Sequence, residues 1–314
     1  MEKTNKTIEE LINKTKFAEH HNNDDSSVNA ILGVDEKNAP ITFKFNDQRS
    51  TIALFGRSGM GKTVMIYDMV YSILSQTDPS KLRIALIDGK GSSFDLIEHN
   101  EEYYNPFLYA PAVNASEDIK YARALIANIV DVYHQRMKLF KENNVSTFDE
   151  YNSLPNVNLL PVIWLIIDEF SAITWRDREL TVRQMNIQGV GSNLEFLVKV
   201  CRESGIRILL SNQSASSNVV SKKILSNIWN RISLGLVSYK ESQNVFENAN
   251  IDLSSINEPG LFYTNMVSDG SNQIRKGKAI FLNFKLVNKL NKELNKQFPN
   301  YSYVKTRKKI LEEK

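Results

Sequence analysis

Residues 56–64 read GRSGMGKTV, a glycine-rich stretch that follows the apolar run TIALF and precedes MIYDMVYSIL, which has helical spacing. Gly56, Gly61, Lys62 and Thr63 meet the pattern G-x-x-x-x-G-K-[ST]. Glycines in such a loop let main-chain N–H groups turn inward around phosphate oxygens, and the following helix directs its positive end at the same charge. The stretch therefore predicts a phosphate-binding loop between a strand and a helix.

This loop also predicts the cofactors. Lys62 would neutralise the β- and γ-phosphates of a nucleotide, and Thr63 would ligate Mg²⁺, so ATP and Mg²⁺ are expected. The alternative is a glycine-rich turn without a ligand, which the flanking strand and helix disfavour. The predicted nucleotide contacts are Gly56, Arg57, Ser58, Gly59, Met60, Gly61, Lys62, Thr63 and Val64.

A second apolar run, VIWLIID at residues 162–168, ends in the acids Asp168 and Glu169. Its length and β-branched content favour a central parallel strand. We expect Asp168 to hold Mg²⁺ and Glu169 to orient or deprotonate an attacking water. A solvated strand end is the alternative. Glu169 also argues against a simple GTPase switch, and less strongly against a small-molecule kinase.

Strand-like and helix-like segments alternate along the chain from residue 40 onward. This alternation predicts an α/β fold with a mostly parallel twisted sheet flanked by helices. In RecA-like P-loop NTPases a polar residue ends the strand beside the acidic one and senses the γ-phosphate. Gln213, in LLSNQ, is the candidate, with Asn212 close by.

The composition indicates a soluble protein. The formal charge is only +3, and the single cysteine, Cys201, excludes a disulfide within the chain. The N-terminus lacks the apolar core of a signal peptide, and the longest apolar run is too short for a membrane span. We therefore expect a cytoplasmic location, with any recruitment to a membrane depending on a partner.

Positive charge is concentrated at the C-terminus, where residues 285–314 carry nine Lys/Arg against three Asp/Glu. Such a tail favours nucleic acid or an anionic surface, and a solvated terminus is the alternative. Tyr301 and Tyr303 could stack on single-stranded bases. The predicted division is an N-terminal extension and linker over residues 1–38, an ATPase domain over 39–284 and a basic tail over 285–314.

The order of these segments resembles the FtsK/SpoIIIE ATPase domain, the motor module of bacterial DNA translocases and conjugative coupling proteins. The resemblance covers about residues 40–284. Besides the phosphate loop it rests on LIDGKGSSFDL (86–96), HQRMKLFKENNVSTFDEYN (134–152), VIWLIIDEFSAI (162–173), CRESGIRILLSNQ (201–213), ILSNIWNRISLGL (224–236) and PGLFYTN (259–265).

The resemblance implies a RecA-like fold, ATP hydrolysis, a homo-oligomeric ring that is usually a hexamer, and DNA in its channel. In such rings a neighbour's arginine reaches the γ-phosphate and stabilises the transition state. Arg231 is the first candidate for this role and Arg202 the second. An ordinary arginine in a salt bridge is the alternative for each.

The sequence departs from the family at SASS, after Gln213, where many DNA translocases carry Arg-Pro. The segment 174–191 is also longer than expected, and we expect no winged-helix domain after the motor. Channel loops of a translocase need side chains that grip phosphates without reading bases. A solvated charged loop is the alternative. The possible DNA contacts are Arg176, Arg178, Arg183, Gln184, Lys222 and Lys223.

Together these features predict an ATP-dependent DNA translocase or coupling motor of a plasmid or other mobile element. It would work with a membrane-bound transfer apparatus or a relaxase. One alternative is a protein-secretion motor similar to type VII secretion ATPases. Another is an ATP-binding regulatory switch, which would not need Glu169.

Overall fold

The computed structural model describes most of the chain as two compact units, each assembled from stretches distant in sequence. The division follows packing, so the predicted boundaries at residues 38 and 284 stay predictions. Unit 1 draws on Met1–Thr77, Asn212–Val220 and Asn230–Gln297, and unit 2 on Asp78–Ser211, Ser221–Trp229 and Phe298–Lys314. The described residues are 28–45, 51–91, 94, 97, 99–100, 103–182, 184–185, 189–247, 250–266, 273–280, 282 and 284–313.

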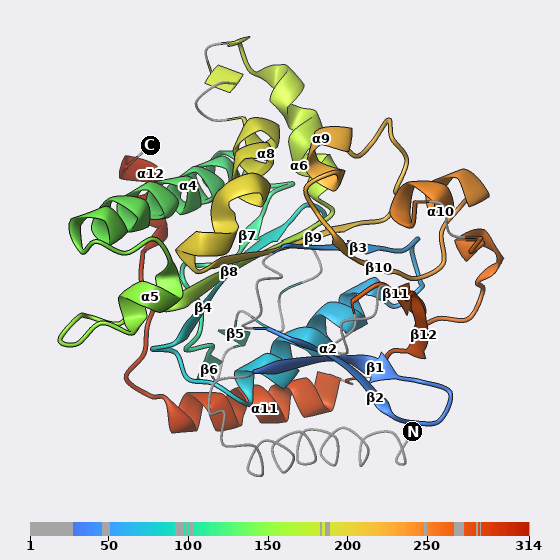
Figure 1. The fold of residues 1–314 in the computed structure, drawn as a ribbon, viewed down its shortest axis with the longest axis horizontal. Helices are drawn as coiled ribbons and strands as arrows, with labels where there is room; N and C mark the ends of the chain where they lie inside the picture. Colours follow the sequence, from blue (N-terminus) through green and yellow to red (C-terminus); the bar gives the residue numbers. More distant parts are fainter. Residues whose placement is uncertain are drawn as a thin grey trace. The chain divides into compact units, whose positions relative to one another are not determined.

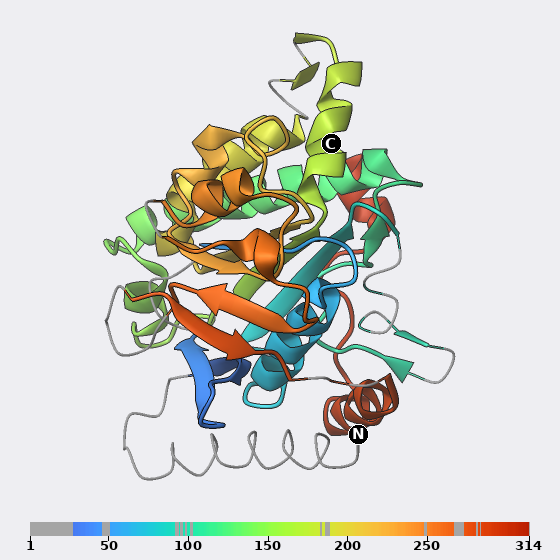
Figure 2. The same ribbon diagram turned by 90° about the vertical axis from the view of Figure 1, so that its right-hand side faces the viewer.

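The described strands of unit 1 follow the order β2-β1-β12-β11-β10-β3. β10 and β3 are parallel, and the other neighbours are antiparallel. Figure 2 shows β11 and β12 as adjacent arrows with opposite directions. The strands are β1 (Asn29–Val34), β2 (Pro40–Lys44), β3 (Thr51–Phe55), β10 (Asn230–Ser233), β11 (Leu261–Thr264) and β12 (Arg275–Lys278).

One part of the predicted linker is wrong, because residues 29–34 form strand β1. Ala30, Ile31 and Leu32 are buried, and the Ile31 N–H donates to Ser72 Oγ at 3.0 Å. A short apolar run thus overrides the polar composition of the stretch around it. The linker prediction averaged over that composition and missed the run.

The helices of unit 1 follow the phosphate loop and the later strands. Almost every residue of α2 is buried, and Tyr71 on this helix donates to Asn291 Oδ1 at 2.7 Å on α11. The predicted helix after Gly61 is confirmed. The helices are α2 (Lys62–Leu74), α10 (Tyr239–Val245), the 3₁₀ turn η3 (Leu253–Ser255) and α11 (Phe284–Gln297).

The main strands of unit 2 are all parallel and follow the order β9-β8-β4-β7. β4 and β8 are seven residues long and buried throughout, which suits strands covered on both faces. Their register places Asp88 opposite Asp168. The strands are β4 (Leu82–Asp88), β7 (Val113–Asn114), β8 (Val162–Asp168) and β9 (Ile206–Asn212), with a separate pair β5 (His99–Asn100) and β6 (Tyr103–Tyr104).

Figure 1 shows α4 and α8 lying side by side over the strands of unit 2. Asp118 caps the long helix α4 by accepting the Tyr121 N–H at 3.0 Å. The helical elements are α4 (Ile119–Glu142), α5 (Phe148–Asn152), α6 (Phe170–Trp175), η1 (Arg176–Glu179), α8 (Val190–Val200), η2 (Cys201–Ser204), α9 (Lys222–Leu225) and α12 (Arg307–Glu312).

A buried arginine attaches α4 to the sheet of unit 2. The guanidinium of Arg136 donates to Ser204 O and to Pro161 O, each at 2.6 Å, just before β9 and β8 begin. It also lies 5.5 Å from the ring centroid of Phe148. Burial lowers the pKa of Arg136 to about 10, so the side chain stays charged at neutral pH.

The C-terminal segment also packs on unit 2. Tyr301 lies under the guanidinium of Arg83, 5.1 Å from ring centroid to Cζ, and Arg307 pairs with Asp118 at the start of α4. The stacking of bases on Tyr301 stays a prediction. Every helix among the described residues is too short or too polar to cross a bilayer.

We predict that Arg136→Met destabilises the protein by about 2–4 kcal/mol, because two buried carbonyl groups lose their charged donor. Chemical denaturation would measure the change in the free energy of unfolding. Arg178→Met removes the same charge at an exposed site and should change stability by less than about 0.5 kcal/mol. Equal effects of the two substitutions would contradict this role for Arg136.

Candidate active site

The phosphate-binding loop occupies the turn between β3 and α2 in unit 1. Gly59 and Gly61 have φ of 80° and 92°, in the left-handed region that glycine adopts without penalty. Gly61 is the N-cap of α2, and no side chain caps the helix there. The backbone conformation, rather than lack of space, requires glycine at Gly59, because a Cβ there would meet nothing within 4 Å.

Neighbouring segments of unit 1 hold this loop in place. The Arg57 N–H donates to Gly235 O at 2.8 Å, and the Gly260 N–H donates to Met60 O at 2.9 Å. The Arg57 guanidinium also donates to Asn257 Oδ1 at 2.7 Å. The loop is therefore fixed before any ligand binds.

The loop fits a phosphate group. Among the described residues, the main-chain N–H groups of Ser58, Gly59 and Gly61 donate to no other protein group. Lys62 begins the helix at the same point and is only 7% exposed. Unused donors, a lysine and a helix N-terminus together form a site for anionic oxygens.

The predicted acidic pair lies at the end of β8 in unit 2. Asp168 Oδ1 accepts the Ser211 hydroxyl at 2.6 Å and the Glu169 N–H at 3.0 Å. The described residues contain no group of three or more His, Cys, Asp or Glu side chains that could hold a metal. A single carboxylate such as that of Asp168 is a ligand that Mg²⁺ accepts together with water and substrate phosphates.

Glu169 is buried, and its backbone is left-handed, with φ and ψ both 50°. Such a conformation costs a non-glycine residue about 1–3 kcal/mol and is concentrated at functional sites. Gly89 approaches so closely that a Cβ there would overlap the Glu169 carbonyl oxygen, and the Gly89 N–H donates to Asp168 O at 2.8 Å. Lys90 Nζ lies 3.6 Å from Glu169 Oε2.

The predicted sensor region lies beside the phosphate loop in unit 1. The Gly56 N–H donates to Asn212 O at 3.3 Å, and Asn212 Nδ2 donates to Ser214 O at 2.7 Å. Gln213 follows and is half-buried. Its contact with a γ-phosphate stays a prediction.

The two arginines predicted to act on a neighbour's nucleotide differ in exposure. Arg231, on β10, is buried; it donates to Val245 O at 2.7 Å and pairs with Glu247 at 3.4 Å. In this structure its guanidinium is held inside unit 1. Arg202, in η2, is exposed.

The possible DNA contacts are mostly at the surface. Arg178 is exposed and lies 5.2 Å from the ring centroid of Trp175, which is itself exposed. Arg176 is half-buried and pairs with Glu179. Gln184, Lys222 and Lys223 are exposed, whereas Arg183 lies outside the described residues.

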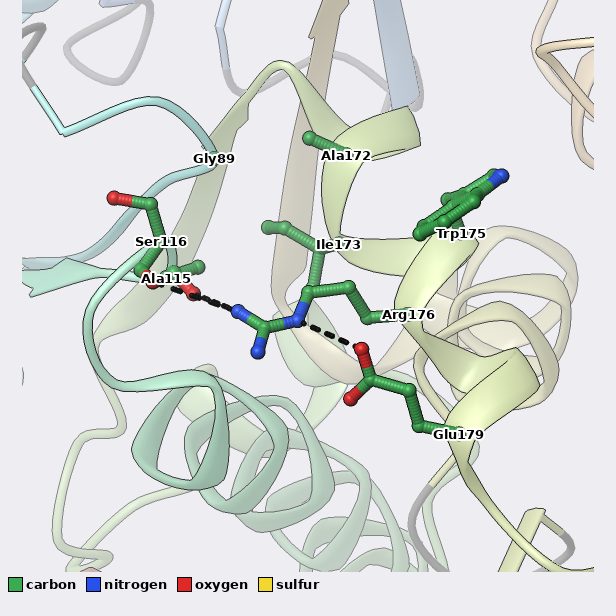
Figure 3. Close-up of a pocket in the computed structure, with 8 residues that line it drawn as sticks. All are labelled: Gly89, Ala115, Ser116, Ala172, Ile173, Trp175, Arg176 and Glu179. Carbon is green, nitrogen blue, oxygen red and sulfur yellow. Dashed lines mark hydrogen bonds and ion pairs between the residues drawn. The ribbon is translucent and has the colours of Figure 1, made fainter.

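A cavity of about 400 Å³ opens beside this segment, in unit 2. Figure 3 shows the Arg176 side chain running across it toward the loop at Ala115 and Ser116. Arg176 donates to the carbonyl oxygens of these two residues at 3.3 and 3.5 Å. Gly89, beside the acidic pair, forms part of the cavity wall.

Sequence reasoning missed three residues of the site. Lys90 pairs with Glu169, Ser211 orients Asp168, and Gly260 supports the phosphate loop. The quoted segments LIDGKGSSFDL, CRESGIRILLSNQ and PGLFYTN contain them. Their roles depend on contacts between distant segments, which no local pattern reveals.

Comparison with known proteins identifies relatives. The model of the FtsK/SpoIIIE family matches residues 11–254. "DNA translocase SftA" of Bacillus subtilis is 26% identical over 226 residues, which cover 71% of this chain and 22% of SftA. "DNA translocase FtsK" of Clostridium tetani is 27% identical over 200 residues, which cover 62% of this chain and 25% of that protein. The chain thus spans about a quarter of the length of these relatives.

Solved structures share the fold. The cytoplasmic domain of the type VII secretion ATPase EccC from Thermomonospora curvata has a TM-score of 0.68 at 17% identity, covering 85% of this chain and 31% of that one. The pCW3 conjugation coupling protein TcpA, in a monomer form with ATPgS, has a TM-score of 0.67 at 19% identity. The likeness covers 85% of this chain and 71% of that one. At these identities the likeness shows the fold alone, and it confirms the predicted P-loop ATPase architecture.

We predict that Lys62→Ala weakens ATP binding roughly tenfold or more, because a charge-assisted contact to phosphate contributes about 1.5–3 kcal/mol. Titration with a fluorescent ATP analogue would measure the dissociation constant. Lys81→Ala, at an exposed lysine, is the matched control. Unchanged affinity in Lys62→Ala would remove the basis for nucleotide binding at this loop.

Proposed function

The chain belongs to the FtsK/SpoIIIE family, and on this basis we propose that it is an ATP-driven DNA translocase. The observation that carries the proposal is the acidic pair at the end of β8, with Asp168 oriented by Ser211 and Glu169 held in a strained backbone conformation. A nucleotide-dependent switch needs no such second carboxylate. The sequence relatives, both named DNA translocases, favour DNA as the polymer.

Each residue of the site has a defined task in this proposal. The phosphate loop and Lys62 bind the nucleotide phosphates, while Thr63 and Asp168 hold Mg²⁺. Mg·ATP supplies the phosphoanhydride bond whose hydrolysis drives movement. Glu169 orients a water and accepts its proton. Gln213 senses the γ-phosphate from the strand end next to the loop.

We further propose that the chain works as a homo-oligomeric ring, with six subunits as the family expectation. A neighbour's arginine would then complete the site and stabilise charge in the transition state. Arg202 lies exposed at the surface, which favours it for this role. Arg231 would first have to leave Val245 and Glu247.

DNA would be gripped through its phosphates rather than read through its bases. The exposed pair of Trp175 and Arg178, and the two lysines that begin α9, offer aromatic and cationic groups for this purpose. The finer proposal is a coupling motor of a plasmid or other mobile element. It would pass DNA to a membrane-bound transfer apparatus or receive it from a relaxase.

Protein secretion is the second candidate, because the fold is shared with a type VII secretion ATPase. That likeness extends equally to a conjugation coupling protein, so the fold does not distinguish the two polymers. The named sequence relatives favour DNA, and the response of hydrolysis to DNA separates the candidates.

We predict that DNA stimulates ATP hydrolysis by the purified protein and that Glu169→Gln lowers kcat by roughly 100-fold or more, since it removes the general base. Steady-state assays with and without DNA would measure both effects, and ATP binding should persist in the variant. Glu142→Gln, at an exposed acid on α4, should match the wild type. Hydrolysis indifferent to any DNA, in a protein that assembles into rings, would favour the secretion motor.

Arg178→Ala should weaken DNA binding and reduce the slope of log affinity against log salt by about one, because one phosphate contact is lost. Fluorescence anisotropy at several salt concentrations would measure the slope. Lys138→Ala removes an exposed charge on α4 and serves as the control. An unchanged slope would show that Arg178 lies outside the DNA path.

A further inference from the structure

Lys90 is a half-exposed residue whose side chain meets the buried carboxylate of Glu169. Its Nζ lies 3.6 Å from Glu169 Oε2, and the Glu169 side chain is 8% exposed while that of Lys90 is 48% exposed. The phosphate-loop motif and the acidic strand together assign no task to this lysine.

The main chain around Lys90 is fixed to the acidic strand. The Lys90 N–H donates to Asp88 Oδ1 at 2.7 Å, and the Gly89 N–H donates to Asp168 O at 2.8 Å. A Cβ on Gly89 would overlap the Glu169 carbonyl oxygen. The main chains of the loop after β4 and of the end of β8 are therefore in direct contact beside the ion pair.

We propose that Lys90 is a positioning residue that restrains Glu169 and keeps hydrolysis slow until DNA is engaged. The inference rests on the proposed function. A general base must face its water and accept a proton from it. While Glu169 Oε2 is held toward the Lys90 ammonium group, that oxygen is directed at the lysine instead of at a water.

The cavity lined by Gly89 and α6 lies where a movement of α6 would separate Glu169 from Lys90. Its wall includes Gly89, next to Lys90, and Ala172, Ile173 and Trp175 of α6, the helix that begins directly after Glu169 (Figure 3). The same two segments that hold the ion pair thus border an open space. A polymer that presses on the exposed Trp175 shifts α6 and so separates Glu169 from Lys90.

The first test is steady-state hydrolysis by Lys90→Met, which keeps the length of the side chain and removes its charge. We expect a several-fold higher kcat without DNA, an unchanged KM for ATP and a smaller stimulation by DNA. Lys90→Arg should restore the low basal rate, and Lys138→Met, at an exposed lysine paired with Glu142, should match the wild type. An unchanged or lower basal kcat in Lys90→Met would overturn the restraint.

The second test measures thermal stability and does not depend on ATP hydrolysis. Thermal denaturation of Lys90→Met, Glu169→Gln and the double variant forms a cycle that isolates the pair. We expect the two changes in Tm to fall short of additivity in the double variant, whereas additive changes would overturn the ion pair. A wild type whose hydrolysis ignores DNA would overturn the proposed function, and a raised basal rate in Lys90→Met would still support the restraint itself.

Discussion

The parallel register of β4, β8 and β9 is the constraint on which the acidic site depends. Each strand is a continuous buried run, and the register sets Asp88 level with Asp168 and Ile167 level with Leu210. A slip by one residue would draw the Asp168 carboxylate into the apolar layer, away from the Ser211 hydroxyl. Burying an ionised group without a partner costs several kcal/mol, so the polar ends lock the register of the apolar strands.

The same register stabilises the strained residue. Glu169 turns the chain from β8 into α6 through a left-handed conformation, and Gly89 leaves just enough room for its carbonyl. The burial of the apolar residues of β4 and β8 offsets the cost of about 1–3 kcal/mol that this conformation carries. Sheet packing therefore fixes the main chain of Glu169, while the side chain is directed by its contact with Lys90.

Local patterns predicted the parts of the site that depend on consecutive residues. The phosphate loop and the buried acidic strand have fixed spacings and were confirmed as a strand–loop–helix and as β8. The linker prediction failed at β1, where three apolar residues were hidden in a polar stretch. The roles of Lys90 and Ser211 could not be predicted, because each depends on the neighbour that the topology supplies. The burial of Arg231 follows equally from the placement of α10, which its own sequence surroundings do not encode.

The contacts of the acidic pair differ in strength, and the difference bears on control. Asp168 is held by a buried hydroxyl and by main-chain groups, which cannot leave without disturbing the sheet. Lys90 is half-exposed, and an ion pair at such a position contributes about 1 kcal/mol or less. The binding of a ligand can supply a free energy of that size, so this ion pair can break while the surrounding fold stays intact. Asp168, the proposed Mg²⁺ ligand, is thus fixed by the architecture, whereas Glu169, the proposed general base, is paired with a half-exposed lysine.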